Sequence, residues 1–570
     1  MTISSLDSAT VTLQQLIDAN KSQQQKMAEQ LIVMIAASIQ ESSNQVGSDQ
    51  SQSIAHIPFQ QFRLDNRQLE ANDVFVLLKS QAANPQKSRH YLLQAAEQAA
   101  FILSEIDPSI LLSEAKNSSN ASSEPQTDSI ASMQQLAALS CHVLYVSNIR
   151  DFLGSLIQAR LQYQQQVTLP TVVAVTGTNG KTTISQLVAQ LTQLMGQSSA
   201  VMGTAGNGRL GALVQASHTT GDALAVQQFL YQMGTEQAEV LALEASSHGL
   251  DQQRLQGMPV TVAIYTNLSR DHLDYHADMA EYAAAKAKLF DKAHFPDLTH
   301  AIINIDDEYA QVMLDMANDS GLTVWTYSLD SSKTATFVAA DITPSLQGVK
   351  IKLRTDFGDE KADNIEVVSP LLGRFNVANL LAAIAAVVAL DVDLAMNIER
   401  IVPAVAQLQG AVGRMQRVPS NDGCFIVDYA HTPDALSQVL ASLKTHCKGQ
   451  LWAVFGCGGD RDAGKRPLMA QAGLACADQV VLTADNPRTE DPNMILQDMQ
   501  AGMTAEQYQR THIEPARQTA IEYAVSHSGV DDIVVIAGKG HETYQEINNV
   551  RYDFDDSVVL QQALNQAGRV

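Results

Sequence analysis

The chain has 570 residues, of which 45% are hydrophobic, and it carries a formal net charge of -24. This length favours roughly three or four domains over a single core. The acidic balance excludes a general nucleic-acid-binding protein and disfavours docking on an anionic membrane, because both need a basic face.

The N-terminus and the apolar segments indicate a cytoplasmic protein that does not insert into a membrane. The first twenty residues contain no Lys or Arg and no apolar core, so we expect no signal peptide. The longest apolar run, Leu380 to Leu390, is too short to cross a bilayer. The five cysteines show no metal-binding spacing, which is typical of reduced cytosolic thiols.

Four segments follow one another along the chain. Residues 1–55 are rich in Gln and Ser and are expected to form a polar extension, followed by domains at residues 56–168, 169–412 and 413–570. In each domain, short buried apolar runs alternate with helical patterns, which predicts α/β folds with largely parallel sheets. The expected strands include residues 73–78, 141–146, 172–175, 240–243, 260–265, 301–305, 425–427, 451–455, 479–482 and 533–537.

A glycine-containing loop lies between an expected strand and an expected helix at the start of the second domain. Its backbone N–H groups and the helix N-terminus suit phosphate oxygens, Lys181 suits the β- and γ-phosphates, and a Thr hydroxyl suits Mg²⁺. The spacing departs from the common phosphate loop, because Val175 stands where a glycine is usual. The alternative is a tight turn with a surface lysine. The candidate ATP-binding residues are Gly177, Thr178, Asn179, Gly180, Lys181, Thr182 and Thr183.

Three further residues of this domain are candidates for the same site. Glu244 ends a buried strand, at the sheet edge where ligands bind in parallel sheets, although a solvated acid is the alternative. His272 follows the next strand and could bind a metal, although a lone histidine is more often a packed residue. Lys286 lies in an alanine-rich helical segment, and by pattern alone a solvated helix lysine is favoured.

Several motifs together resemble the Mur ligase family over about residues 60–560. They are residues 177–183, Glu244-Ala-Ser-Ser-His-Gly249, Asn267-Leu-Ser-Arg-Asp-His-Leu-Asp274, Gly373-Arg-Phe-Asn-Val-Ala-Asn379 and Asp428-Tyr-Ala-His-Thr-Pro433. The family's cytoplasmic enzymes use ATP to add amino acids to UDP-N-acetylmuramoyl peptides. The resemblance implies an α/β fold of three domains: a UDP-binding N-terminal domain, a central P-loop-type ATP-binding domain with a mostly parallel sheet, and a Rossmann-like C-terminal α/β domain that binds the amino acid.

The resemblance also assigns roles around the phosphates. It implies that Lys181, Glu244, His272 and Lys286 are catalytic, and that Lys286 is carbamylated by CO₂, which reverses the interpretation from the helix pattern. Mg²⁺ would be held by Thr182, Glu244, His272 and the carbamate of Lys286. The remaining nucleotide contacts would come from Asn376, Asn379, Arg414 and Asp428.

The third domain carries motifs that resemble those of the family members that add meso-diaminopimelate. A planar arginine can bind the extra carboxylate of this amino acid through two parallel hydrogen bonds, and Arg488 is the candidate. Asp485-Asn-Pro-Arg488 also favours a turn, which would aim the arginine. Ala463 replaces a lysine that is usual in the family. The implied diaminopimelate-binding residues are Arg461, Asp485, Asn486, Pro487, Arg488, Gly538 and Glu542.

The resemblance finally implies a site for UDP-N-acetylmuramoyl-L-alanyl-D-glutamate. Asn66 stands where the family usually has Ser, and His218 where it usually has Asn. The implied residues are Leu64, Asn66, Ser80, Gln81, Ala82, His218, Thr219, Thr220, Ser246, Gln252 and Arg254.

The resulting hypothesis is a monomeric, ATP- and Mg²⁺-dependent ligase that adds meso-diaminopimelate to this nucleotide-linked dipeptide through an acyl phosphate. Two alternatives stay open. One is a lysine-adding ligase of the same family, and the other is a nucleotide-binding regulator or transporter ATPase without ligase activity. A panel of amino acids in an ADP-release assay separates all three.

Overall fold

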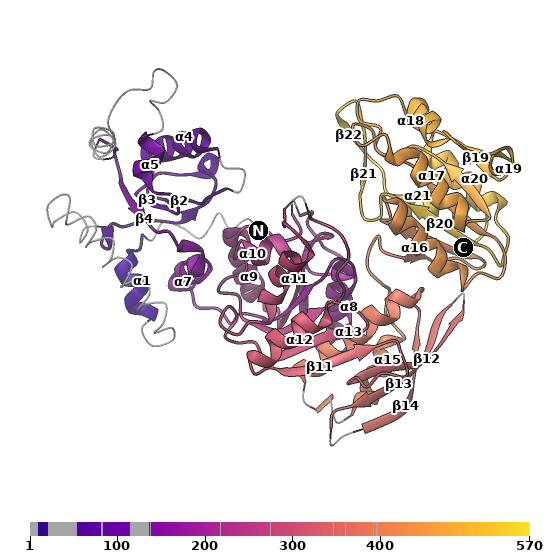
Figure 1. Cartoon of the computed structure of the whole chain (residues 1–570), viewed down its shortest axis with the longest axis horizontal. Coiled ribbons are helices and arrows are strands. Elements are labelled where there is room, and N and C mark those ends of the chain that lie inside the picture. Colours follow the sequence, from indigo (N-terminus) through magenta and orange to yellow (C-terminus); the bar gives the residue numbers. More distant parts are fainter. Residues whose placement is uncertain are drawn as a thin grey trace.

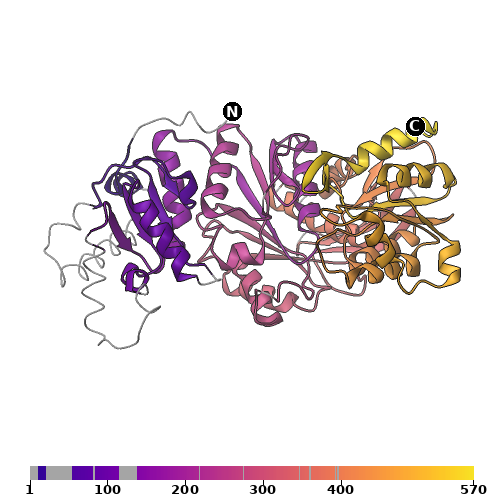
Figure 2. The same cartoon turned by 90° about the horizontal axis from the view of Figure 1, so that it is seen from above.

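The computed structural model describes residues 10–20, 54–80, 84–113, 136, 138–216, 218–273, 275–345, 347–358, 361–391, 393–394 and 397–570. Three α/β units follow one another along the long axis of the molecule, from the indigo N-terminal unit to the yellow C-terminal unit (Figures 1 and 2). Each unit is built on its own sheet. The prediction of α/β domains in series is therefore confirmed.

The N-terminal domain contains a parallel sheet in the order β1-β2-β3-β4 with helices on both faces. Alternate strand residues enter two cores: Val74 and Val76 pack with α1 and α7, whereas Phe75 and Leu77 pack with α4 and α5. Its elements are α1 (Leu13–Asn20), β1 (Phe62–Arg63), η2 (Asn66–Gln68), β2 (Val74–Leu77), α4 (Pro85–Ala96), β3 (Phe101–Ser104), α5 (Pro108–Ser113), β4 (His142–Tyr145), η4 (Ile149–Asp151) and α7 (Leu153–Gln164).

The polar extension predicted for residues 1–55 is in part integral to this domain. Val11 forms a β-bridge with Phe59, and Leu13, Leu16 and Ile17 of α1 are buried in the domain core. This short amphipathic helix was not predicted, because the segment around it is rich in Gln and Ser. Its apolar residues nevertheless recur at helical spacing. Most of the remaining predicted extension lies outside the described residues.

The central domain is a three-layer structure around a ten-stranded sheet. Helices α8 and α13 cover one face, and α9, α11 and α12 cover the other. The strand order is β14-β13-β12-β11-β10-β9-β5-β8-β6-β7, with parallel pairing from β12 to β6. The mostly parallel sheet predicted from the sequence is confirmed, although β12, β13 and β14 add an antiparallel meander that was not predicted.

The strands of the central domain are β5 (Thr171–Thr176), β6 (Ser199–Gly203), β7 (Gly206–Gly208), β8 (Val240–Glu244), β9 (Val260–Tyr265), β10 (His300–Asn304), β11 (Thr323–Ser328), β12 (Phe337–Ser345), β13 (Gly348–Asp356) and β14 (Lys361–Ser369). Its helices are α8 (Lys181–Leu194), α9 (Ala223–Thr235), α10 (Ser247–Asp251), α11 (Met279–Ala287), η5 (Lys288–Phe290), α12 (Ala310–Asp319), α13 (Arg374–Leu390), η6 (Ile398–Ile401) and α15 (Val402–Val405).

The C-terminal domain is a second three-layer structure on a six-stranded sheet, in the order β15-β16-β20-β17-β18-β19. All neighbours are parallel except β15 and β16. Its strands are β15 (Gln416–Val418), β16 (Cys424–Asp428), β17 (Leu451–Phe455), β18 (Gln479–Leu482), β19 (Thr511–Ile513), β20 (Ile533–Ala537) and the separate hairpin β21 (Tyr544–Ile547) and β22 (Val550–Asp553). Its helices are α16 (Pro433–Lys444), α17 (Lys465–Cys476), α18 (Pro492–Met499), α19 (Ala505–Gln509), α20 (Arg517–His527) and α21 (Asp556–Gln566).

A buried histidine joins the central and C-terminal domains. The Gly373 N–H, which precedes α13, donates to His446 Nε2 over 3.0 Å, and His446 Nδ1 lies 2.8 Å from the Ser345 carbonyl oxygen. Because Nε2 accepts, the proton of the neutral ring resides on Nδ1 and is donated to Ser345. Burial lowers the pKa of His446, since the charged ring would lose water, while the Ser345 carbonyl opposes this shift.

We predict that the contribution of His446 to the stability of the folded protein falls in acid. A histidine whose pKa is lowered by folding contributes stability above its ordinary pKa of about 6.5, and this contribution falls as the pH drops below that value. The slope is at most about 1.4 kcal/mol per pH unit. In urea unfolding, His446→Leu should cost more at pH 8 than at pH 5, whereas replacement of the exposed His90 by Leu should show no such trend. A cost of His446→Leu that stays constant with pH would contradict the prediction.

Candidate active site

The loop from Gly177 to Gly180 lies at the carboxyl edge of the central sheet, between β5 and α8. Gly177 has φ +149°, and a Cβ atom there would lie 1.8 Å from Thr266 Oγ1. Gly180 has φ +89°, and its Cβ atom would lie 2.6 Å from Asn379 Oδ1. Both positions therefore require glycine. The end of β9 supports the loop, because the Thr178 N–H donates to the Asn267 carbonyl oxygen over 2.8 Å.

Lys181 begins α8 and bends back over this loop. Its Nζ donates to the carbonyl oxygens of Gly177 and Thr178, each over 2.9 Å. Burial lowers the pKa of Lys181, and the positive charge of Arg414 lowers it further, whereas Glu244 and Asp271 oppose the shift. Arg414 belongs to the C-terminal domain, so a charge from that domain acts on Lys181 in the central domain.

Glu244 ends β8 and is almost fully buried. Its carboxylate accepts hydrogen bonds from the Thr204 N–H over 2.8 Å and from Thr204 Oγ1 over 3.1 Å. Thr204 Oγ1 also lies 3.0 Å from Thr219 Oγ1, and Thr220 Oγ1 donates to the Glu244 carbonyl oxygen over 2.8 Å. The structure thus brings two predicted substrate residues, Thr219 and Thr220, next to the predicted catalytic carboxylate.

Lys286 is not the solvated lysine that its helical pattern favours. Only 1% of the residue is exposed, and Nζ donates to the Gly177 carbonyl oxygen over 2.8 Å. It also lies 4.5 Å from the centre of the Tyr282 ring. Burial holds the pKa of Lys286 well below its ordinary value, and the nearby charge of Lys181 adds to this effect. The structure therefore corrects the pattern-based interpretation, because α11 turns this side chain inward.

His272 lies at the same edge, in the segment that follows β9. Its backbone has φ 54°, and its ring centre lies 5.0 Å from that of His248 and 5.8 Å from that of Tyr282. The Tyr282 hydroxyl in turn contacts Thr178 Oγ1 at 3.2 Å. His272 is thus placed close to the glycine loop through Tyr282.

The predicted metal ligands have a chemistry that suits Mg²⁺ in part. Within the described ranges, no group of three or more His, Cys, Asp or Glu residues is arranged to hold a metal. Glu244 and Thr182 offer oxygen atoms, which Mg²⁺ prefers, whereas the His272 nitrogen is a less usual ligand for it. The Lys286 ammonium group cannot bind a cation, but a carbamate would add two oxygen atoms.

Two of the predicted nucleotide contacts, Asn376 and Asn379, lie on α13, and Asn379 approaches Gly180 of the loop. Asn376 and Asn379 are buried, and Asn379 Nδ2 donates to Asn376 Oδ1 over 3.1 Å. Asp428 of β16 accepts from the N–H groups of Met415 and Ala430, each over 2.7 Å, and burial raises its pKa. Arg414 stacks over the Tyr429 ring at 4.4 Å.

The predicted diaminopimelate residues gather at the carboxyl edge of the C-terminal sheet, after the adjacent strands β17, β18 and β20. Asn486 Nδ2 donates to Glu542 Oε2 over 3.0 Å, and Arg488 Nη1 donates to the Gly459 carbonyl oxygen over 2.7 Å. A Cβ atom on Gly538 would lie 2.9 Å from Asp485 Oδ2. The turn places Arg488 at φ 51°. Pro487 lies in this turn, and Arg461 lies beside Gly458 in the loop after β17.

One residue of this cluster, Lys539, was not predicted from the sequence. Its fully buried side chain lies between Glu542 and Asp485. The sequence could have identified Lys539, because it belongs to the Gly538–Glu542 motif. It was not chosen because a positively charged side chain does not suit contact with a cationic amino group.

A cavity of about 300 Å³ lies between the N-terminal and central domains. Five of the predicted UDP-muramoyl-dipeptide residues line it: Leu64, Ser80, His218, Gln252 and Arg254. Lys79, which directly precedes the predicted Ser80, also lines it, as does Arg150, which was not predicted. Arg150 donates to Glu105 of the N-terminal domain over 2.8 Å and to the Gln252 carbonyl oxygen over 3.1 Å, so it links the two domains at the cavity.

Of the other predicted residues of this group, Thr219 and Thr220 lie next to Glu244, as described above, and Asn66 and Ser246 are not part of the cavity lining. Asn66 Nδ2 instead donates to Gln94 Oε1 over 2.8 Å, which directs the side chain towards α4. Ser246 caps α10 through the Gly249 N–H over 3.1 Å. Gln81 and Ala82 lie outside the described residues.

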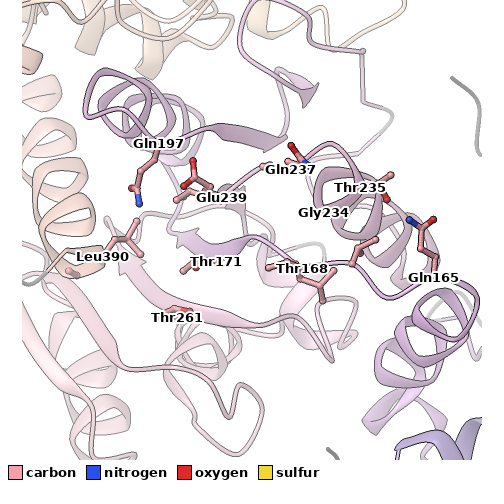
Figure 3. Close-up of a pocket in the computed structure, with 15 residues that line it drawn as sticks. Gln165, Thr168, Thr171, Gln197, Gly234, Thr235, Gln237, Glu239, Thr261 and Leu390 are labelled. Carbon is pink, nitrogen blue, oxygen red and sulfur yellow. The ribbon is translucent and has the colours of Figure 1, made fainter.

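A second cavity, of about 780 Å³, lies at the opposite edge of the central sheet (Figure 3). Thr171, Val240 and Thr261, at the amino ends of β5, β8 and β9, line it, together with the chain that enters β5. As far as the structure describes the chain, the cavity contains none of the predicted site residues. Ligands of parallel sheets bind at the carboxyl edge, so this larger cavity does not mark the active site.

No helix among the residues the structure describes combines the length and the apolar character that crossing a membrane requires.

Comparisons with known proteins agree with this arrangement. Residues 175–387 match the model of the Mur ligase middle domain, and residues 413–540 match that of the Mur ligase glutamate ligase domain. The chain is 39% identical over 514 residues to the UDP-N-acetylmuramoyl-L-alanyl-D-glutamate–2,6-diaminopimelate ligase of Vibrio vulnificus, covering 90% of this chain and 95% of the relative. It is 46% identical over 394 residues to the ligase of the same name from Pseudomonas aeruginosa, covering 69% and 77%.

A solved structure bearing the same ligase name is also similar, with 41% identity and a TM-score of 0.66. The similarity covers 91% of this chain and 97% of that one. It therefore includes all three domains.

Proposed function

The chain belongs to the Mur ligase family, and we propose that it joins meso-diaminopimelate to UDP-N-acetylmuramoyl-L-alanyl-D-glutamate with the hydrolysis of ATP to ADP and phosphate. The observation that carries the proposal is the cluster of Asp485, Asn486, Arg488 and Glu542 at one sheet edge. A guanidinium group and two carboxylates gathered at one sheet edge suit an amino acid with an additional carboxylate and an additional ammonium group. The names of the curated relatives support the same substrate pair.

The reaction proceeds through an acyl phosphate. The side-chain carboxylate of the dipeptide's D-glutamate attacks the γ-phosphorus of ATP, and ADP leaves. The amine of diaminopimelate then attacks the acyl carbon, and the tetrahedral intermediate releases phosphate and a proton to give the amide. Lys181, at the head of α8, offsets the negative charge on the transferring group. Arg414 brings further positive charge from the C-terminal domain.

Mg²⁺ is the proposed cofactor. Thr182 and Glu244 would hold it through oxygen atoms, with His272 and a carbamate on Lys286 as further ligands. When bound, the ion offsets phosphate charge in the transition state. The donor chemistry fits this ion provided that Lys286 is carbamylated, since its free ammonium form would repel a cation.

The precursor and the amino acid are cytoplasmic metabolites, and we place the protein in the cytoplasm. We also propose that it acts as a monomer.

The test of this function is ADP release with a panel of amino acids. We predict release only when both the UDP-linked dipeptide and meso-diaminopimelate are present. Lys181→Ala should reduce it by roughly 100-fold or more, because a charge that stabilises the transferring phosphoryl group is lost. Lys292→Ala, which removes an exposed lysine, is the matched control. Release with lysine in place of diaminopimelate would favour a lysine-adding ligase, and release without either substrate would favour a simple ATPase.

A second prediction concerns the carbamate. The neutral amine of Lys286 adds to CO₂ and loses a proton, which leaves a carbamate anion; its burial and low pKa support this step. Protein equilibrated with ¹³C-labelled CO₂ should show a carbamate resonance in ¹³C NMR. Lys286→Met should abolish it, whereas Lys288→Met, two residues further along the chain, should retain it. The absence of a resonance from the parent protein would exclude the modification.

A third prediction concerns the choice of amino acid. Bound lysine would leave Arg488 facing an empty position, and such an unpaired polar group can reject a substrate by ~10⁴-fold. Arg488→Ala should therefore lower kcat/KM for diaminopimelate far more than for lysine. Arg488→Lys should also fail, because an ammonium group cannot form the bidentate contact.

The control for Arg488 is Arg551→Ala, which removes a largely exposed arginine from the neighbouring hairpin. It should leave the ratio of the two kcat/KM values unchanged. Equal losses of Arg488→Ala on both amino acids would mean that Arg488 supports the fold or the chemistry and does not recognise the second carboxylate.

A further inference from the structure

Lys539 is a fully buried lysine at the centre of the cluster that we assign to the amino acid. Its Nζ lies 3.3 Å from Glu542 Oε2, 3.2 Å from Asn486 Oδ1 and 3.8 Å from Asp485 Oδ1. None of the lysine side chain is exposed, whereas 21% of Glu542 and 12% of Asp485 are. The lysine therefore lies behind the carboxylates and away from the surface of the pocket.

The side chain of Asn486 is already committed to this cluster. Its Oδ1 accepts from Lys539 Nζ and from the Glu546 N–H, the latter over 2.9 Å, and its Nδ2 donates to Glu542 over 3.0 Å. A carbonyl oxygen has two lone pairs, so the described contacts use both. Asn486 consequently connects Lys539, Glu542 and the β21–β22 hairpin and offers no acceptor to a ligand.

The burial of a lysine at this point has a clear energetic reason. An ammonium group is costly to bury unless charged or polar partners replace its water, and here carboxylates supply that replacement. In the other direction, the carboxylates of Asp485 and Glu542 would repel each other without a cation between them. One lysine therefore holds both acids in place and faces no ligand itself.

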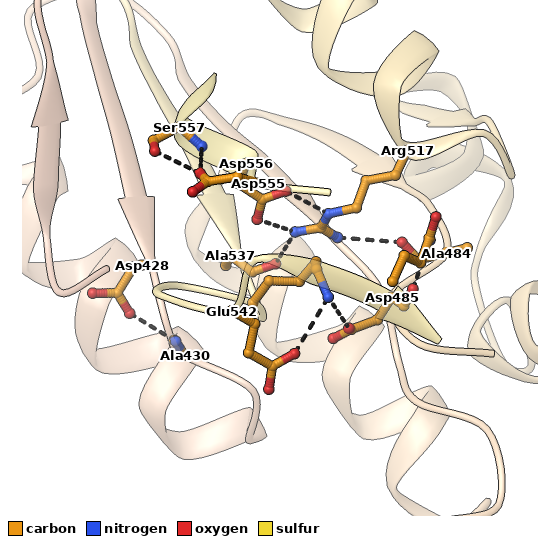
Figure 4. Close-up of polar contacts among 12 residues, drawn as sticks. Asp428, Ala430, Ala484, Asp485, Arg517, Ala537, Glu542, Asp555, Asp556 and Ser557 are labelled. Carbon is orange, nitrogen blue, oxygen red and sulfur yellow. Dashed lines mark hydrogen bonds and ion pairs between the residues drawn. The ribbon is translucent and has the colours of Figure 1, made fainter. Parts of the chain in front are cut away.

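A second buried cation fixes the main chain beneath the same two acids. Arg517 forms two hydrogen bonds with Asp556, of 2.8 and 2.7 Å, and both side chains are fully buried. It also donates to the carbonyl oxygens of Ala537 over 3.0 Å and Ala484 over 3.3 Å (Figure 4). These residues directly precede Gly538 and Asp485. Arg517 thus anchors the backbone, and Lys539 anchors the side chains that the backbone presents.

We propose that Lys539 is a positioning residue for the amino acid: it orients Asp485, Glu542 and Asn486 so that the two carboxylates receive the ammonium group of the substrate. The inference rests on the proposed function, since it concerns the pocket assigned to diaminopimelate. It separates the residues that touch the substrate, namely Asp485, Glu542 and Arg488, from Lys539 and Asn486, which act through them.

The test compares Lys539→Met with the parent protein. Methionine matches the length of the lysine stem but lacks its charge, so the two acids lose their common partner. KM for meso-diaminopimelate should rise on the order of 10- to 100-fold, as expected when a buried charged group loses its hydrogen bonds. KM for ATP and for the UDP-linked dipeptide should stay within about twofold, since those sites lie elsewhere. Lys444→Met, which breaks an exposed ion pair with Asp478 in the same domain, should change none of the three.

A double-mutant cycle distinguishes positioning from simple structural support. If Lys539 acts through Glu542, then Lys539→Met in a Glu542→Gln background should raise KM for diaminopimelate much less than it does in the parent. A rise that is the same in both backgrounds, or a rise in all three KM values, would overturn the proposal. So would an unchanged KM for diaminopimelate in Lys539→Met.

Two further comparisons keep the outcome clear. If Lys539→Met does not fold, Asn486→Leu removes the acceptor of Lys539 while the lysine stays, and the same selective rise in KM is expected. ADP release by the parent protein is measured first. A parent without diaminopimelate-dependent release would refute the proposed function, whereas an active parent with an unaffected Lys539→Met would refute only the role of Lys539.

Discussion

Two lysine side chains from different helices donate to one carbonyl oxygen, that of Gly177. Lys181 comes from the first turn of α8, and Lys286 comes from the last turn of α11. Two ammonium groups converge on one acceptor at the cost of mutual repulsion. Burial is the main cause of the lowered pKa of Lys286, and the charge of Lys181 lowers it further. The arrangement requires Gly177 at a backbone angle that other residues rarely adopt. It also requires α11 to pack directly beneath the glycine loop. The remainder of the central site is arranged around this point.

The parallel sheets explain why distant sequence motifs meet. Glu244 ends β8, Thr266 follows β9, and both strands neighbour β5, which leads into the loop. In the C-terminal domain, the segments after β17, β18 and β20 meet in the same way. A one-strand change in either order would separate the side chains by roughly 5 Å, the distance between adjacent strands. The predicted sites therefore depend on strand order, which single motifs do not encode.

Buried strands could be predicted from the sequence because their apolar runs are continuous. The limits of β9, β17, β18 and β20 were predicted to the residue, namely Val260–Tyr265, Leu451–Phe455, Gln479–Leu482 and Ile533–Ala537. The β12–β14 meander was not predicted, because strands with one exposed face mix polar and apolar residues, as in Lys361–Ser369. Helix α1 was missed for a related reason: its few apolar residues are separated by glutamines.

Some site residues can be identified from the neighbouring sequence, whereas the environment of others depends on distant segments of the chain. Gly177 to Thr183 could be identified from the loop itself, since its conformation and chemistry follow from the residues in it. The burial of Lys286 depends on the packing of α11 against Gly177, 109 residues earlier in the chain, so the local helical pattern favoured the wrong environment. Lys539 shows the same limit in a different form. Its partners Asp485 and Asn486 follow β18, whereas Lys539 and Glu542 follow β20. Only the strand order, which brings these ends to the same sheet edge, reveals that one buried cation contacts both Asp485 and Glu542. A lysine is unsuited to contact an ammonium group, but Lys539 lies behind the carboxylates and therefore does not face it.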